Sequence, residues 1–183
     1  MTSANEKAFT LPPHHLRVVL VEPDIPQNTG NIARLCSITG AELHLVKPLG
    51  FFLTEKHFRR SGMDYLSNVY LSVHESLDDL LRVMTGTCRL FSAHGTEGLW
   101  DTRFNSDDWL FFGSETAGLP ARLRQMYPGN MVRIPMHHGQ RCLNVSTAAG
   151  IAVYEALRQI AGVGQLAPAV QTGFACDRGT TNE

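Results

Sequence analysis

The sequence predicts an α/β fold, a mostly parallel β-sheet flanked by helices. Short apolar runs, such as the one at 16–21, alternate along the chain with longer amphipathic stretches. This alternation is typical of parallel sheets whose strands are joined by helices. The 183 residues are 43% hydrophobic and 18% charged, which is the composition of a globular protein of about one domain.

Strands are expected where a short apolar run is bounded by polar or turn-forming residues. The first run, LRVVLV, is typical of a strand buried inside a parallel sheet, and it ends before two prolines. The other runs have similar length and similar boundaries. The expected strands are Leu16–Val21, Glu42–Val46, Val69–Val73, Arg89–Ala93, Trp109–Phe112 and Met131–Ile134.

Helices are expected where an amphipathic stretch carries end signals. Asn28 can cap the first helix by accepting a backbone N–H, and Gly40 can end it. Pro120 suits a first turn, and Asn144 or Ser146 can cap the last helix. The expected buried face of that last helix consists of Ile151, Tyr154 and Leu157. The expected helices are Asn28–Thr39, Thr54–Ser61, Ser76–Met84, Pro120–Met126 and Asn144–Ile160.

The two ends of the chain lack this pattern. We expect a flexible N-terminal extension at 1–14, one domain at 15–161 and a flexible C-terminal tail at 162–183. No apolar run approaches the roughly 18 residues of a membrane helix, and the N-terminus lacks the apolar core of a signal peptide. The expected location is therefore cytoplasmic, with no membrane partner. The four cysteines form no C-x-x-C pair, which argues against structural zinc and against a disulfide framework.

Three segments follow expected strands at their carboxyl ends, where α/β proteins bind ligands. Glu22–Cys36 joins a strand to a helix, and it places Arg34 on the side of the helix opposite its apolar face. Such an arginine can bind phosphate, or it can be an ordinary solvated residue. Leu110–Pro120 is a strand followed by a glycine-rich turn that carries Glu115, and it is either a ligand loop or a plain strand–turn–helix connection.

The third segment, Arg133–Glu155, contains a polar loop and then a run of small residues at 146–150, which would allow another backbone to approach closely. A basic group at Lys56, Arg59 and Arg60 can meet RNA phosphates or form a solvated face. The formal net charge of −1 lacks the basic balance of many nucleic-acid binders, so RNA contact would come from local patches.

In this order, the three segments resemble the motifs of the SPOUT superfamily, specifically the SpoU-type RNA 2′-O-ribose methyltransferases. The matching patterns are EPxIPxNTGNIxRLC, FGxETxGLP and RIPM…LNxSxAxxIxxYEA, and the likeness spans residues 16–161. It is strongest to the short branch that methylates the tRNA wobble nucleotide, cytidine or uridine 34. The resemblance implies a C-terminal trefoil knot, S-adenosyl-L-methionine as cofactor, a homodimer, no metal, and the anticodon stem-loop of tRNA as substrate.

The resemblance also implies roles for individual residues. Arg34 and Asn28 would be catalytic, with Asn28 facing the reacting centre. Arg34 would hold the phosphate beside the target ribose rather than act as a base, because a guanidinium stays protonated. The residues implied to bind the cofactor are Ala93, Gly113, Glu115, Ile134, Cys142 and Leu143. Those implied to contact RNA are Lys56, Arg59, Arg60, Asn144, Ser146 and Tyr154.

Other functions stay open. A SpoU-type enzyme could act on ribosomal RNA instead, although the short chain favours tRNA by analogy. A non-catalytic RNA-binding relative is disfavoured because Asn28, Arg34, Glu115 and Asn144 are all present. A dinucleotide-binding oxidoreductase shares the fold class, but no G-x-G-x-x-G follows any expected strand.

Overall fold

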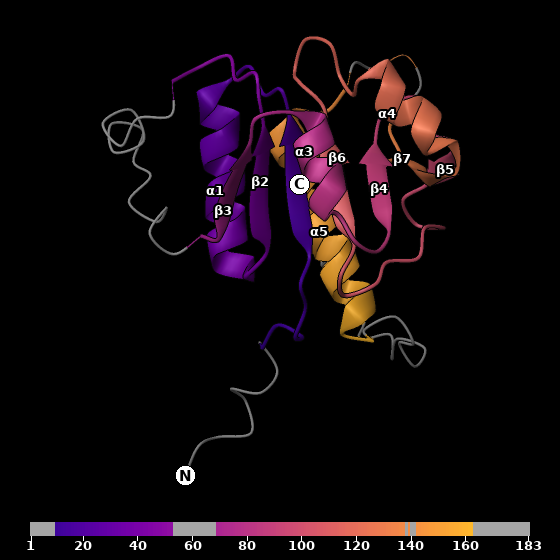
Figure 1. Cartoon of the computed structure of the whole chain (residues 1–183). Helices are drawn as coiled ribbons and strands as arrows, with labels where there is room; N and C mark the ends of the chain where they lie inside the picture. The colour runs from indigo at the N-terminus through magenta and orange to yellow at the C-terminus, as the bar shows by residue number, and fades with distance from the viewer. Residues whose placement is uncertain (1–9, 53–68, 138, 140–141, 163–183) are drawn as a thin grey trace, which may run out of the picture.

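Every strand pair in the sheet is parallel, as the alternation of strands and helices predicts. The computed structural model of the chain describes residues 10–52, 69–137, 139 and 142–162. The strand order is β3-β2-β1-β6-β4-β7-β5 (Figure 1). The strands are β1 (Arg17–Val21), β2 (Glu42–Val46), β3 (Leu71–His74), β4 (Cys88–Phe91), β5 (Glu97–Gly98), β6 (Trp109–Phe112) and β7 (Met131–Arg133).

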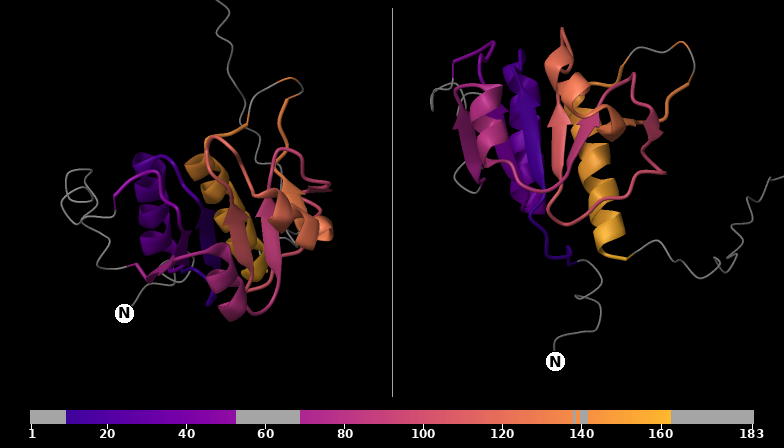
Figure 2. Two further views of the ribbon diagram at one scale, coloured as in Figure 1. Left: turned by 45° about the horizontal axis from the view of Figure 1, so that its top comes forward. Right: turned by 45° about the vertical axis from the view of Figure 1, so that its right-hand side comes forward.

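Helices cover both faces of the sheet. Helices α1 (Pro26–Thr39) and α5 (Val145–Ile160) lie side by side on one face, and α3 (Leu77–Val83) and α4 (Ala121–Met126) lie on the other (Figures 1 and 2). A short 3-10 helix, Pro128–Asn130, precedes β7. The core divides accordingly into two apolar clusters, one on the α1 and α5 side and one on the α3 and α4 side.

Most strand boundaries differ from the predicted ones by one or two residues, while Glu42–Val46 and Trp109–Phe112 are confirmed. The two-residue strand β5 was not predicted, because a segment this short carries no periodicity. It pairs with β7, where Glu97 lies opposite Val132. The preceding turn is tight, since a Cβ on Gly95 would lie only 2.4 Å from the carbonyl carbon of Val132.

The predicted start of the first helix was wrong. Helix α1 begins at Pro26, and its N-cap is Ile25, which makes no side-chain capping bond. Pro26 can occupy the first turn because its fixed φ suits a helix and its missing N–H would lack a partner there anyway. Asn28 therefore lies inside the first turn, only 6% exposed, and its side chain is available for contacts outside the helix. Gly40 ends α1 in the left-handed region, as expected.

The predicted buried face of the last helix was wrong at two of its three positions. Leu157 is buried, but Ile151 and Tyr154 are 37% and 51% exposed. The face of α5 that enters the core instead consists mainly of small residues: Ala149, Ala152, Val153 and Ala156. Small side chains let α5 pack closely against α1 and β6. The close backbone approach expected at 146–150 is not found at Gly150, where an added Cβ would meet nothing within 4 Å.

Several expectations fall on residues outside the described ones: the helix Thr54–Ser61 with Lys56, Arg59 and Arg60, and the terminal stretches 1–9 and 163–183. Within the described part of the chain, no helix is long and apolar enough to cross a membrane. Cys36, Cys88 and Cys142 are free thiols. Burial raises the pKa of the Cys36 thiol to about 12, so this side chain behaves as an apolar core residue.

A pair of histidines at the β2–β3 edge makes stability depend on pH. His44 is buried, and its Nδ1 lies 2.9 Å from Nε2 of His74. Burial lowers the pKa of His44 below its ordinary value of 6.5, against the opposing effect of the hydrogen bond that His44 donates to Glu42. Burial lowers the pKa of His74 in the same direction. The native state therefore binds fewer protons than the unfolded chain as the pH falls below 6.5.

We expect the melting temperature to be highest above pH 6.5 and to fall as the pH drops toward the lowered pKa values. Differential scanning fluorimetry from about pH 8 to about pH 5 measures this slope. The variant His44→Gln should show a shallower slope, whereas His15→Gln, which changes an exposed histidine, should keep the slope of the wild type. Equal slopes in all three proteins would contradict the assignment.

Candidate active site

A cavity of about 820 Å³ opens beside the carboxyl ends of β4 and β6. Strands β1 and β6 are neighbours in the middle of the sheet. From β1 the chain adds β2 and β3 on one side, and the later strands β4, β7 and β5 lie on the other side, beyond β6. Such reversals of strand order are where open α/β sheets bind ligands. The volume also falls within the range of small-molecule and cofactor pockets.

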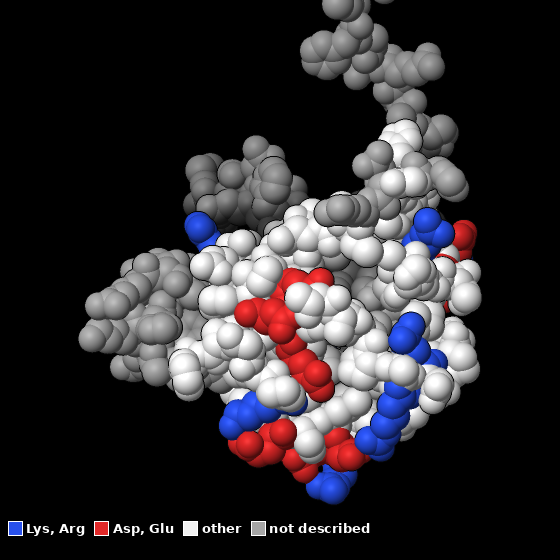
Figure 3. Space-filling model, turned by 90° about the horizontal axis from the view of Figure 1, so that it is seen from above, with Lys and Arg blue, Asp and Glu red and all other residues white. Residues whose placement is uncertain are grey.

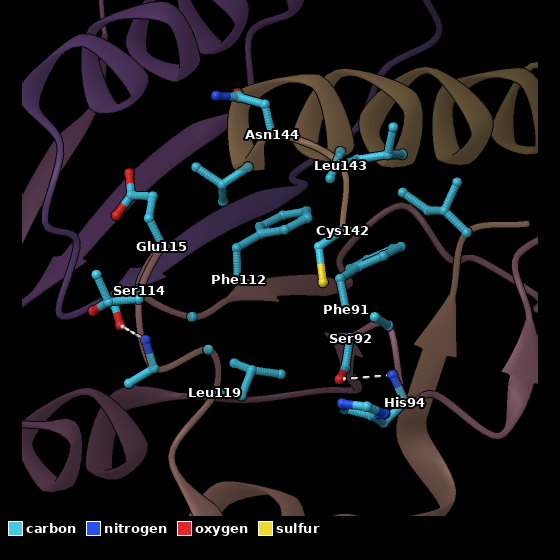
Figure 4. Close-up of a pocket in the computed structure, with 18 of the residues that line it drawn as sticks. Phe91, Ser92, His94, Phe112, Ser114, Glu115, Leu119, Cys142, Leu143 and Asn144 are labelled. Carbon is cyan, nitrogen blue, oxygen red and sulfur yellow. Dashed lines mark hydrogen bonds between the residues drawn. The ribbon is translucent and has the colours of Figure 1, made fainter. Parts of the chain in front are cut away.

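The floor and walls of the cavity are largely apolar. Figure 4 shows Phe91 and Phe112 in the cavity, with the sulfur of Cys142 beside them. Polar groups are fewer, and Asn28, Glu115 and Asn144 lie together at one side. An apolar cavity with a few placed polar groups is suited to a flat heterocycle that carries a polar chain. The apolar lining includes Phe91, Phe112, Leu119, Ile134, Met136 and Leu143.

The structure brings together the residues that the sequence assigned to cofactor binding. All six line this one cavity: Ala93, Gly113, Glu115, Ile134, Cys142 and Leu143. Asn28 and Asn144 line it as well, so the three sequence motifs meet here. Arg34, Ser146 and Tyr154 are not among its lining residues.

A row of hydrogen bonds joins the three motifs at the polar side of the cavity. The Nδ2 group of Asn28 donates to Oε1 of Glu115 at 2.7 Å. The Nδ2 group of Asn144 donates to Oδ1 of Asn28 at 3.0 Å. Asn144 also caps α5, because its Oδ1 accepts from the backbone N–H of Ser146 at 2.9 Å. The start of α5 and the wall of the cavity therefore both depend on the side chain of Asn144.

The donor and acceptor roles in this row of hydrogen bonds are fixed. The Oδ1 of Asn144 must accept from backbone N–H groups at the start of α5, so its amide nitrogen must face Asn28. Asn28 then has to present its oxygen to Asn144 and its own amide nitrogen to Glu115. Glu115 must therefore be an acceptor, and the backbone N–H of Asp24 occupies its other oxygen at 2.8 Å. Glu115 thus acts on Asn28 as a positioning residue.

Sequence reasoning missed Asp24 and Thr116, which complete the polar side. Asp24 Oδ2 accepts from the hydroxyl of Thr116 at 2.6 Å and from its backbone N–H at 3.3 Å. Since the backbone of Asp24 also donates to Glu115, the loop after β1 and the loop after β6 hold each other. Both residues lie inside the matching motifs, but nothing in their local pattern indicates a partner about ninety residues away.

The variant Glu115→Gln tests whether Glu115 must accept hydrogen bonds through both of its carboxylate oxygens. Glutamine offers one acceptor and one donor, so a donor would face either Asn28 or the N–H of Asp24. We expect the free energy of unfolding to fall by about 1–3 kcal/mol, and catalysis that needs an oriented Asn28 to fall by about 100-fold. Thermal melts and single-turnover assays measure the two effects. The matched variant Glu97→Gln, on β5, should change neither; similar losses in both variants would remove Glu115 from this role.

Arg34 lies on the exposed side of α1, as predicted, and it is not one of the residues that line the cavity. It follows Asn28 by six residues, which is about 9 Å along the helix and about 120° around it. Its side of α1 also carries Ile38, one turn further on, which is 61% exposed.

No metal centre is found in the residues that the structure describes: no group of three or more His, Cys, Asp or Glu side chains there is arranged to hold an ion. The polar side chains at the cavity instead bind one another, as the row from Asn144 through Asn28 to Glu115 shows.

Comparison with known proteins gives a consistent result. Residues 15–154 match the model of the SpoU rRNA Methylase family. A tRNA (cytidine(34)-2′-O)-methyltransferase from Polaromonas sp. (strain JS666) is 44% identical over 156 residues, covering 83% of this chain and 95% of the relative. A solved structure, described as giving insights into the 2-OH methylation of C/U34 on tRNA, superposes with a TM-score of 0.77 at 41% identity, covering 82% of this chain and 99% of that one.

A less similar protein of known structure was solved with a bound ligand. The SpoU methyltransferase AviRb from Streptomyces viridochromogenes, solved in complex with AdoMet, is similar with a TM-score of 0.71 at 25% identity. The similarity covers 87% of this chain and 63% of AviRb. The family match over most of the chain and the identity to full-length relatives agree with the three motifs that meet at the cavity. The chain belongs to the SpoU methylase family.

Proposed function

We propose that this chain is an S-adenosyl-L-methionine-dependent methyltransferase that modifies the ribose 2′-oxygen of nucleotide 34, cytidine or uridine, in the anticodon stem-loop of tRNA. The observation that carries the proposal is the cavity where the three motifs meet, in a chain of which 83% aligns with 95% of a tRNA (cytidine(34)-2′-O)-methyltransferase. A tRNA substrate also implies a cytoplasmic enzyme.

The cavity fits this cofactor. Its aromatic and aliphatic lining suits an adenine ring, and the loops at Gly113 and Cys142–Leu143 bring backbone groups to its edge. The proposed cofactor-binding residues are the six predicted ones, with Glu115 acting through Asn28. When bound, the cofactor supplies a methyl group on a positively charged sulfur, which needs no metal.

The residues of the chain then have to position the ribose hydroxyl against the methyl group. A ribose hydroxyl is a weak nucleophile until its proton leaves, and the attacking oxygen has to lie in line with the methyl carbon and the sulfur. Asn28, held by Glu115 and Asn144, offers an amide of fixed orientation in the wall of the cavity. Arg34 is proposed to bind the phosphate beside the target ribose, which fixes the sugar. Ser146 and Tyr154, together with the basic group Lys56, Arg59 and Arg60, are proposed RNA contacts.

A homodimer would bring Arg34 to a cavity. Helices α1 and α5 lie together and expose the large apolar side chains of Ile38, Ile151 and Tyr154. Apolar groups gathered on neighbouring helices are typical of subunit interfaces. Because Ile38 and Arg34 share one side of α1, an interface on this side would place Arg34 against the partner subunit. We therefore propose a composite site, with the cavity from one subunit and Arg34 from the other.

The family fold further implies a trefoil knot in the C-terminal segment. One close approach supports the proposal: the backbone of Val132 passes directly beside Gly95, where a Cβ would lie 2.4 Å from the carbonyl carbon of Val132. Strand β7 also lies between β4 and β5, and the chain then returns across the sheet to place α5 beside α1.

Methyl transfer to defined RNA tests the proposal. The purified protein is incubated with S-adenosyl-L-methionine, labelled in its methyl group, and an unmodified anticodon stem-loop. Label should enter this substrate and should not enter the same stem-loop with 2′-deoxyribose at position 34. Equal labelling of the two would place the modification elsewhere, and labelling of ribosomal RNA fragments alone would favour the ribosomal alternative. Nuclease mapping of tRNA from cells without the protein gives an independent answer, since an unchanged methyl group at position 34 would refute the tRNA assignment.

A further inference from the structure

The charged residues around the cavity are distributed unevenly. Two carboxylates lie at its α1 side: Glu115 in the wall, and Asp24, whose backbone N–H donates to Glu115. Seen along the strands from their carboxyl ends, one group of acidic side chains lies in the middle of this face, whereas the basic side chains lie nearer its edge, together with other acidic ones (Figure 3). The two sides of the cavity therefore differ in charge.

Arg124 provides the opposite charge. Among the described residues that line the cavity, it is the one Lys or Arg. It belongs to α4, which follows the turn at Gly118 and Leu119, so it lies across the cavity from the N-terminal turn of α1. A ligand in this cavity would therefore meet carboxylates at one end and a guanidinium at the other.

The guanidinium of Arg124 has no hydrogen bond or ion pair within the described part of the chain, unlike most other arginines there. Its neighbour on α4, Arg122, pairs with Asp78 through two oxygens, at 3.0 and 2.6 Å. The two arginines lie on one short helix and are both exposed, yet only Arg124 faces the cavity with its donors unused. A guanidinium with five free donors is suited to two oxygens of one anion.

We propose that Arg124 is a ligand-binding residue of the cavity that takes an anionic oxygen pair, either the carboxylate at the amino-acid end of the cofactor or a phosphate of the RNA. The inference rests on the proposed function. The distribution of charge fits the first source well: the sulfonium and ammonium of the cofactor would lie toward the acidic side, and its carboxylate toward α4. Arg124 would then set the direction in which the cofactor lies.

Calorimetry with two ligands separates the sources. S-adenosylhomocysteine carries the carboxylate, and 5′-methylthioadenosine lacks the whole amino-acid end. For Arg124→Gln, we expect about 3- to 10-fold weaker binding of S-adenosylhomocysteine and unchanged binding of 5′-methylthioadenosine. Arg122→Gln is the matched control and should bind both ligands as the wild type does. Arg124→Lys should recover part of the loss, because it restores the charge without the paired donors.

The remaining outcomes decide the proposal. Unchanged S-adenosylhomocysteine binding with a raised KM for the anticodon stem-loop would identify the RNA phosphate as the anion. Equal weakening of both ligands, or no change in either binding or KM, would overturn the role of Arg124. Failure of the wild-type protein to bind S-adenosylhomocysteine would refute the proposed function itself, so the two failures are distinguishable.

Discussion

Gly113→Ala is expected to destabilise the protein strongly and to disrupt the cavity. A Cβ at this position would lie 2.0 Å from the carbonyl carbon of Gly118 and 2.1 Å from the nitrogen of Leu119. Both are backbone atoms, so relief requires the whole turn to move. We expect a loss of about 3 kcal/mol or more in the free energy of unfolding and a melting temperature lower by about 6–12 °C.

The control for this experiment is Gly129→Ala, in the short 3-10 helix before β7. An added Cβ there meets nothing within 4 Å, and the residue has no positive φ. This variant should melt within about 2 °C of the wild type. If Gly113→Ala behaved like Gly129→Ala in thermal and urea unfolding, the close contact between the turn at 114–118 and the end of β6 would be disproved.

Arg34→Ala is expected to have the largest effect on methyl transfer. Arg34 lies outside the cavity, so its removal should leave the affinity for S-adenosylhomocysteine unchanged. The rate of the methyl-transfer step should fall by about 100- to 1,000-fold, the usual effect of losing one charged group that acts on the reacting centre. Single-turnover assays with the anticodon stem-loop measure this rate. Arg82→Ala, on the opposite face of the sheet, is the control and should remain fully active.

Mixed subunits test whether Arg34 acts across a dimer. Arg34→Ala and Glu115→Gln should each keep no more than about 1% of the wild-type activity alone, but a mixed dimer would combine one intact cavity with one intact Arg34. Random pairing of equal amounts should therefore restore about a quarter of the wild-type sites. No recovery, with exchange of subunits verified by native mass spectrometry, would show that Arg34 acts within its own chain or not at all.

The fold class could be predicted because its signals are local. The runs at β1, β2 and β6 are apolar enough to be recognised without any knowledge of their neighbours, and Gly40 and Ser76 end and begin helices by their own backbone and side-chain chemistry. The two-residue strand β5 could not be predicted, because its only support is the pairing of Glu97 and Gly98 with β7.

Asn28 shows where local reasoning failed within the site. The residue type is a good helix cap, and the sequence therefore assigned it that task. Its partners are instead Glu115 and Asn144, 87 and 116 residues away. The buried face of α5 was wrong for a related reason: the helical spacing of Ile151 and Tyr154 indicated that face, but only small residues such as Ala152 permit the close packing against α1. Long-range contacts decided both outcomes.

The double task of Asn144 has a consequence for synthesis on the ribosome. One amide both starts α5 and closes the polar side of the cavity, and the neighbouring wall comes from Cys142 and Leu143. While these residues are still inside the ribosome, the cavity is incomplete and cannot bind a ligand. The free energy of ligand binding therefore cannot stabilise the partly folded nascent chain. The strands of the sheet all precede Cys142, so any folding of the sheet before that point gains nothing from ligand binding, and the cavity is complete only once the last helix docks.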